Sequence, residues 1–220
     1  MRRRRFEWAG SASMGYAAPW RNPVNTVIAS TVVGVCMAIG AAALVGLTAA
    51  EAQHFPAHSL DASDARSDEF RNRWYSRHLD AMGEVALVPS AETRTYRFLW
   101  LRTFHEPIAV RVVRDASGDR VIATQLDGAG GYAAGKVSRR TEIALTPAQA
   151  DAFEQGLEAD GLWTLPVPRE QAGKDGSEWV VEGASTRYRV VRQWSPEDGP
   201  VRAMGERFLA LTGWTFEPKY

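Results

Sequence analysis

The pattern of apolar and polar positions divides the chain into segments of different kinds. Residues 24–50 contain no charged side chain. From residue 64 apolar side chains recur at helical spacing, and from residue 93 β-branched and aromatic residues gather in runs of strand length. The predicted organisation is a basic arm (1–23), an apolar segment (24–50), a linker (51–63), an amphipathic helix (64–83) and a domain (93–214).

The apolar segment 24–50 has the length of a transmembrane helix. Its core, residues 27–47, would be about 31 Å long as an α-helix, which matches a hydrocarbon layer of about 30 Å. Every arginine of the arm precedes this segment, so the arm should be cytoplasmic and the C-terminal domain extracytoplasmic. The sequence therefore predicts a single-pass protein of the cell inner membrane.

A cleaved signal peptide is the alternative interpretation of the same segment. Thr48-Ala49-Ala50 and Ala50-Glu51-Ala52 both have the small residues that a signal peptidase accepts. Cleavage would leave the domain secreted or periplasmic. The long basic arm and an apolar run well beyond about 15 residues favour an uncleaved anchor.

Small residues recur at every fourth position of the apolar segment. The stripe consists of Ser30, Gly34, Ala38, Ala42 and Gly46. Such a stripe lets two helix backbones approach closely, so a homodimer paired through this face is one hypothesis. More than half of the segment is Ala, Gly, Ser, Thr or Cys, so the stripe also fits a chance arrangement.

The residues after the apolar segment predict a linker and then a helix. His54 and His58 in the linker have the spacing of helical metal ligands, but Pro56 between them argues against a helix, so no metal site is predicted. In the helix, Phe70, Trp74, Leu79 and Met82 share roughly one face, and Gly83 provides a C-terminal stop. We expect this helix to pack on the domain or, alternatively, to lie along the membrane surface.

Six runs in the domain have strand character and two have helix character. The predicted strands are Thr95–Phe104, Ile108–Asp115, Arg120–Leu126, Lys136–Leu145, Ser177–Glu182 and Thr186–Gln193. One predicted helix begins at Thr146-Pro147, and another follows Ser195. The predicted fold class is α+β: an N-terminal transmembrane helix, then an antiparallel β-sheet domain (ββββ-α-ββ-α) with helices packed on one face.

The charge distribution bears on partners. Five arginines against Glu7 give residues 1–23 a net charge of +4, so residues 51–220 must sum to −4 in a chain of zero net charge. A mildly acidic domain argues against nucleic acid as a partner. The only cysteine, Cys36, lies in the apolar segment, so the domain has no disulfide. The expected partners are the lipid bilayer, a second copy, and an envelope protein or glycan.

One glycine-rich motif approaches a phosphate-binding loop. Gly130-x4-Gly135-Lys136 has the spacing, but Val137 stands where Ser or Thr would hold Mg²⁺, and a strand rather than a helix follows. We interpret it as a hairpin loop that uses glycine for turn geometry. The sequence also lacks Gly-x-Ser-x-Gly, Ser-x-x-Lys and His-Glu-x-x-His motifs. No cofactor and no metal are predicted.

A few polar and aromatic residues are candidates for chemistry or binding. His105 and Glu106 end a predicted strand, where a general base can lie. Asp175 and Glu178 begin another strand, and paired carboxylates are what glycoside hydrolysis needs. Three tryptophans nearby in sequence are candidates for a sugar-binding platform: Trp163, Trp179 and Trp194. The alternative is that these residues shape turns and pack the sheet.

The second half of the chain carries three short motifs. They are Phe153-x3-Leu157-x5-Trp163-x-Leu165-Pro166, Asp175-Gly176-Ser177-x-Trp179 and Tyr188-x-Val190-x-Arg192-x-Trp194-Ser195-Pro196. With them, residues 105–213 resemble a group of uncharacterised bacterial envelope proteins. The resemblance implies a small exported or membrane-anchored domain and carries over no catalytic residue.

Two functions are consistent with these patterns. The first is a single-pass membrane protein whose extracytoplasmic domain binds a partner or supports envelope structure, and the absence of catalytic motifs favours it. The alternative is an envelope hydrolase acting on glycan or peptidoglycan. A cleft that unites two of the candidate acids would favour the enzyme, and an exposed apolar patch would favour the binding domain.

Overall fold

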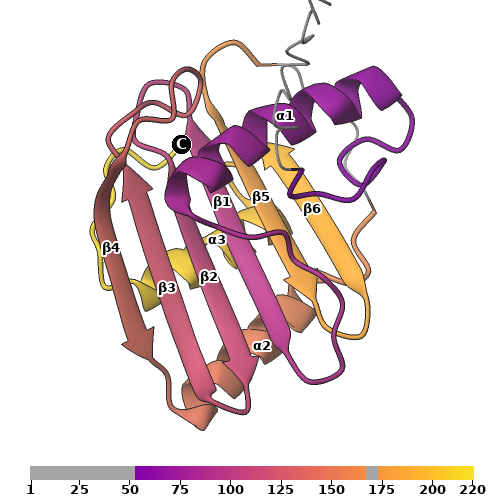
Figure 1. Ribbon diagram of the computed structural model, residues 1–220, viewed down its shortest axis with the longest axis vertical. Coiled ribbons are helices and arrows are strands. Elements are labelled where there is room, and N and C mark those ends of the chain that lie inside the picture. The colour runs from indigo at the N-terminus through magenta and orange to yellow at the C-terminus, as the bar shows by residue number, and fades with distance from the viewer. Residues whose placement is uncertain (1–52, 167–172) are drawn as a thin grey trace, which may run out of the picture. The chain divides into compact units, whose positions relative to one another are not determined.

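A six-stranded antiparallel sheet forms the centre of the fold (Figure 1). The computed structural model describes residues 53–166 and 173–220. The strands are β1 (Arg94–Arg102), β2 (Ile108–Asp115), β3 (Gly118–Leu126), β4 (Val137–Ala144), β5 (Ser177–Ala184) and β6 (Tyr188–Trp194). Their order across the sheet is β4-β3-β2-β1-β5-β6. The first four strands therefore lie side by side in chain order as a meander, and the β5–β6 hairpin pairs with β1.

Three helices cover the two faces of this sheet. Helices α2 (Pro147–Ala159) and α3 (Gly199–Leu211) lie behind the sheet in Figure 1, and α1 (Ala65–Met82) crosses its front. Helix α1 begins at the N-cap Asp64 and ends at Gly83, which has a left-handed backbone conformation with φ of 69°. Helix α2 begins at the predicted Thr146 cap, whose side chain forms a capping box with Gln149.

The face under α2 and α3 is packed with apolar and aromatic side chains. Phe98 of β1 stacks on Phe208 of α3 with ring centroids 5.9 Å apart, and it contacts Trp179 of β5 at 5.1 Å. Helix α3 comes this close because Gly205 has no side chain: a Cβ there would lie 2.4 Å from the Trp179 ring. This face holds the larger of the two hydrophobic clusters.

The face under α1 combines apolar packing with buried charges. Tyr75, Leu79 and Met82 of α1 belong to a cluster with sheet residues such as Leu99. Beside this cluster, Arg97 of β1 is fully buried and its guanidinium lies 2.6 Å from the Glu182 carboxylate of β5. Strands β1 and β5 are covered on both faces, so nearly all of their residues are buried and exposed positions do not alternate with buried ones.

The predicted fold class needs correction at the membrane helix. Among the residues that the structure describes, no helix combines the length and apolar character needed to cross a membrane. The fold is an α+β arrangement of a six-stranded antiparallel sheet and three helices. The two helices of the predicted ββββ-α-ββ-α domain, α2 and α3, share one face of the sheet as predicted, and α1 covers the opposite face. The apolar segment 24–50, with its stripe at Ser30, Gly34, Ala38, Ala42 and Gly46, lies outside the described residues.

The part of the predicted linker that the structure describes, residues 53–63, contains buried side chains. His54, Phe55 and Leu60 are buried. The Asp68 carboxylate of α1 explains this, because it accepts hydrogen bonds from the backbone N–H groups of His58, Leu60 and Asp61, at 2.9, 2.8 and 3.0 Å. The segment before α1 is thus folded onto the domain, and α1 itself packs on the sheet.

Candidate functional site

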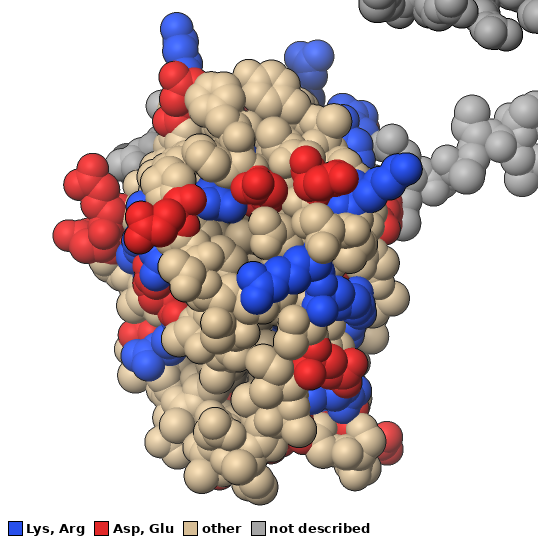
Figure 2. All heavy atoms as spheres, turned by 90° about the vertical axis from the view of Figure 1, so that its left-hand side faces the viewer, with Lys and Arg blue, Asp and Glu red and all other residues tan. Residues whose placement is uncertain are grey.

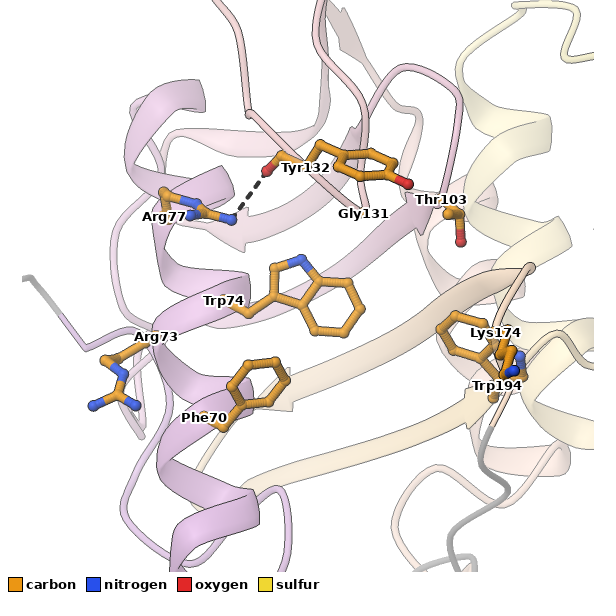
Figure 3. A pocket seen from close by; sticks show the side chains of 9 residues that line it. All are labelled: Phe70, Arg73, Trp74, Arg77, Thr103, Gly131, Tyr132, Lys174 and Trp194. Carbon is orange, nitrogen blue, oxygen red and sulfur yellow. Dashed lines mark hydrogen bonds between the residues drawn. The ribbon is translucent and has the colours of Figure 1, made fainter.

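A cleft of about 650 Å³ opens beside α1 at the end of the sheet where β1 ends and β5 begins (Figure 3). Its volume is in the range of small-molecule sites. The lining residues come from α1, the β1–β2 turn, the β3–β4 loop and the β5 and β6 ends: Phe70, Arg73, Trp74, Arg77, Thr103, Gly131, Tyr132, Lys174 and Trp194. Figure 3 shows Lys174 and Trp194 across the cleft from the side chains of α1.

Aromatic side chains form much of the cleft wall. Phe70 and Trp74 lie one helical turn apart on α1, with ring centroids separated by 6.2 Å. Phe70 is 59% exposed and Tyr132 is 60% exposed, which is unusual for such large apolar groups. Trp74 is held in place because its indole Nε1 donates a hydrogen bond of 2.8 Å to the backbone oxygen of Gly130. The wall therefore offers apolar contact area that the fold itself does not cover.

All charged residues that line the cleft are cations. None of the nine lining residues is Asp or Glu. Arg77 donates a 3.0 Å hydrogen bond to the Tyr132 backbone oxygen, which keeps its charge at the rim. Arg73 forms an exposed ion pair with Glu69, with a nitrogen–oxygen distance of 2.8 Å. A wall with this composition attracts anions.

One histidine beneath the cleft adds no charge to it. His78 of α1 is fully buried, and its Nδ1 lies 2.9 Å from the Trp74 backbone oxygen. Burial lowers the pKa of His78 from its ordinary value, because the charged imidazolium loses its water. The imidazole is therefore neutral at pH 7. The positive charge at the cleft comes from its arginines and Lys174.

The glycine-rich loop positions the upper wall of the cleft. The N–H of Gly130 donates to the backbone oxygens of Arg102 and His105, at 2.9 and 3.0 Å, and a Cβ at Gly130 would lie 2.6 Å from the Leu101 backbone. Gly135 has a φ of 79°, and Lys136 continues directly into β4. The interpretation as a hairpin loop that uses glycine for turn geometry is confirmed.

The predicted pair His105 and Glu106 lies outside the cleft wall. His105 Nδ1 is 2.6 Å from the Tyr220 hydroxyl. The Glu106 carboxylate is 3.5 Å from a terminal nitrogen of Arg102. Both side chains therefore contact neighbouring parts of the chain, and neither lines the cleft.

The predicted carboxylates Asp175 and Glu178 are separated by burial. Asp175 is exposed, whereas Glu178 is buried beneath α1, 3.7 Å from Arg192. Burial raises the pKa of Glu178, and the positive charge of Arg192 opposes this rise. Neither residue lines the cleft. The structure does not bring them together as an acid–base pair.

The three predicted tryptophans lie in different surroundings. Trp179 is fully buried in the core under α3. Trp163 is partly buried against the same core, with the Arg187 guanidinium 4.8 Å from its ring centroid. Trp194 lines the cleft. The tryptophans thus form no shared platform, and Trp194 is the candidate that lies at the described cleft.

Sequence reasoning missed most of the cleft. The sequence pattern groups Phe70, Trp74, Leu79 and Met82 on roughly one face of the helix. In the structure Leu79 and Met82 are buried and Trp74 packs partly against their cluster, whereas Phe70 is exposed. The alternation of two aromatics with Arg73 and Arg77 at helical spacing was the available signal. No local pattern marked Tyr132 or Lys174. Within residues 53–166 and 173–220, no group of three or more His, Cys, Asp or Glu is arranged to hold a metal ion.

No protein-family model matches the chain, and no curated protein matches it. The resemblance of residues 105–213 to bacterial envelope proteins stays a prediction.

Proposed function

We propose that the domain binds an organic anion with an apolar body, and that the cleft beside α1 is its binding site. One observation carries this proposal: exposed aromatic side chains and three cationic residues line the same cleft, and no carboxylate does. The composition of the cleft wall indicates the class of ligand. It is a molecule with a flat or aliphatic body and a carboxylate, phosphate or sulfonate group.

The two kinds of wall residue serve different parts of such a ligand. Phe70, Trp74 and Tyr132 offer apolar surface, and burying such surface contributes about 25 cal/mol per Å². Arg77 and Lys174 can contact the acid group. At about 4 Å a pair of unit charges near a protein surface interacts by about 4 kcal/mol, so each cation can contribute noticeably to affinity.

The cleft supports binding better than hydrolysis. Its wall contains no carboxylate or histidine to move a proton. Among the nine lining residues, Thr103 has the only aliphatic hydroxyl group. This hydroxyl donates a hydrogen bond to the Gly176 backbone oxygen at 2.9 Å and accepts one from the Gly176 N–H at 3.2 Å. This hydroxyl is therefore engaged in the fold. A binding function also agrees with the absence of catalytic motifs from the sequence.

A matched pair of fluorescent ligands tests the proposal. The probe 1-anilinonaphthalene-8-sulfonate has an aromatic body and a sulfonate, and N-phenyl-1-naphthylamine has the same rings without the charge. With the full-length protein we expect saturable, one-site binding of the sulfonate that is tighter than binding of the amine. Increasing salt should weaken sulfonate binding, because exposed charges are screened.

Substitutions at the cleft locate the binding. The double variant Arg77→Gln/Lys174→Gln should weaken sulfonate binding about tenfold or more and leave amine binding nearly unchanged. The matched control is Arg66→Gln, an exposed arginine of the same helix outside the cleft. Equal affinity for the two ligands, or an equal loss with Arg66→Gln, would contradict the proposal.

A further inference from the structure

Strand β4 forms an open edge of the sheet. It pairs with β3 on one side and ends the strand order on the other. Its eight residues are mostly exposed and include no proline or glycine, and Val137 is 46% exposed. Figure 2, which views the molecule from this side, shows Lys or Arg and Asp or Glu side chains interspersed along the surface. The edge is thus accessible and carries charges of both signs.

The hydrogen bonds of β4 show which backbone groups remain open. The N–H of Leu145 donates to the Asp119 backbone oxygen of β3 at 2.8 Å. Hydrogen-bonded pairs alternate along an antiparallel ladder, so the backbone N–H and C=O groups of the odd-numbered residues of β4 point toward β3. The N–H and C=O groups of Arg140 and Glu142 therefore point outward, and they form no backbone hydrogen bond with any described residue.

A second β4 strand fits these open groups in one charge-matched register. Two antiparallel copies related by a two-fold axis at Thr141 would place Arg140 opposite Glu142 of the partner subunit, twice. Arg140 and Glu142 are exposed and lie on the α1 side of the sheet. Within one subunit Arg140 donates to the Met82 backbone oxygen at 3.2 Å and Glu142 lies 3.7 Å from Arg120, so contacts to a partner would add to these. Opposite charges at directly paired positions stabilise a strand pair.

The neighbouring registers are less favourable. A two-fold axis at Arg140 would place two arginines opposite each other, and an axis at Glu142 would place two glutamates opposite each other. Like charges at paired positions destabilise a strand pair. The backbone hydrogen bonds do not separate these three registers, because each of them pairs even-numbered, outward-pointing positions with one another, so the charges decide.

We propose that two copies of this chain associate through their β4 edges, with Thr141 on the two-fold axis, and form one continuous antiparallel sheet. The partner is a second copy rather than a foreign strand because the charge pattern of β4 is complementary to itself. The cleft beside α1 lies at a different part of the domain, so this inference is independent of the proposed ligand.

Disulfide trapping tests both the dimer and its register. Position 141 pairs with itself in a non-hydrogen-bonded site, where Cα atoms are about 4.5 Å apart, within the range that a disulfide spans. In a Cys36→Ser background, Thr141→Cys should form a cross-linked dimer under mild oxidation. Ser138→Cys is the matched control, because its two copies would lie about 20 Å apart along the strands.

Sedimentation of the uncross-linked full-length protein gives the second readout. A reversible dimer should appear across the micromolar range. Glu142→Arg should weaken it about tenfold or more, because like charges then face each other twice. Glu158→Arg makes the same charge change on the exposed surface of α2 and should leave association unchanged. Circular dichroism should show that both variants fold.

The outcomes separate cleanly. Selective cross-linking at position 141 together with a Glu142→Arg defect supports the proposal. A monomer at every concentration overturns it. Equal cross-linking of Thr141→Cys and Ser138→Cys, or a dimer that Glu142→Arg and Glu158→Arg weaken equally, assigns association to another surface and also overturns it.

Discussion

The two faces of the sheet use opposite means to hold their helices. Under α2 and α3, the contacts are aromatic and aliphatic, as in the stack of Phe98, Trp179 and Phe208. Under α1, buried charged residues of the same two strands, Arg97 and Glu182, lie among the apolar side chains. The strands β1 and β5 therefore present apolar side chains to one helix layer and mixed polar contacts to the other.

The two faces therefore have different roles: the α2 and α3 face contributes bulk stability, and the α1 face positions the cleft. Apolar burial is non-directional, so the α2 and α3 face supplies cohesion without fixing one geometry. Ion pairs are directional. Arg97 donates to the backbone oxygen of Val85, just beyond the end of α1, at 2.7 Å, and its guanidinium lies 3.6 Å from Glu84. These contacts anchor the end of the helix that carries Phe70 and Trp74.

Arg97→Met should give the largest effect. It leaves Glu182 and Glu84 buried with less compensation, and removing one partner of a buried ion pair costs about 3–5 kcal/mol. Urea unfolding followed by circular dichroism measures the loss. Arg66→Met, on the exposed side of α1, should change the free energy of unfolding by less than about 0.5 kcal/mol. If the two variants were equally stable, the buried charges would not anchor α1.

Gly205→Ala should give an intermediate effect on the apolar face. Its Cβ would lie 2.4 Å from the Trp179 ring, and overpacking typically costs about 1–3 kcal/mol. At an unobstructed helix position the same substitution would stabilise the protein by up to about 1 kcal/mol. The sign of the change in the free energy of unfolding therefore shows whether the Trp179 ring obstructs a side chain at position 205. An increase in stability would show that α3 does not pack this closely.

The pH dependence of stability should give the smallest effect. Burial raises the pKa of Glu182, which the Arg97 charge opposes, so the folded state holds this proton more tightly than the unfolded state. This contribution to stability is full below the ordinary carboxyl pKa of 4.5 and is lost as pH rises through the folded pKa. Glu182→Gln should flatten that decline in urea titrations at several pH values. An unchanged decline would assign it to other groups.

The sequence predicts the sheet better than the cleft. The runs of β-branched and aromatic residues and the Thr146 cap are local signals, and the observed bounds of the strands and of α2 follow them closely. Helix α1 was harder to orient, because Phe70 and Trp74 are as apolar as the residues that are buried. Which aromatic faces the sheet depends on the opposing surface, and no pattern within the helix shows that surface.

The cleft is a product of tertiary structure. Its walls come from segments around residues 70–77, 103, 131–132, 174 and 194. The antiparallel pairing of β1 with β5 and the hydrogen bonds of Gly130 to Trp74 and to the end of β1 bring them together. The burial of the segment before α1 is not predictable from the sequence for a similar reason. The Asp68 carboxylate fixes its backbone at a distance of up to ten residues, which periodicity does not reveal.

The indole N–H resonances of the eight tryptophans offer the most direct test of the central claim. They are assigned by single Trp→Phe substitutions in nitrogen-15 correlation spectra of the full-length protein. Titration with 1-anilinonaphthalene-8-sulfonate should shift the Trp74 and Trp194 resonances saturably, because both line the cleft, and leave buried Trp179 unchanged. Saturable shifts at Trp163 without shifts at Trp74 and Trp194 would contradict the account, as would no saturable shift at all.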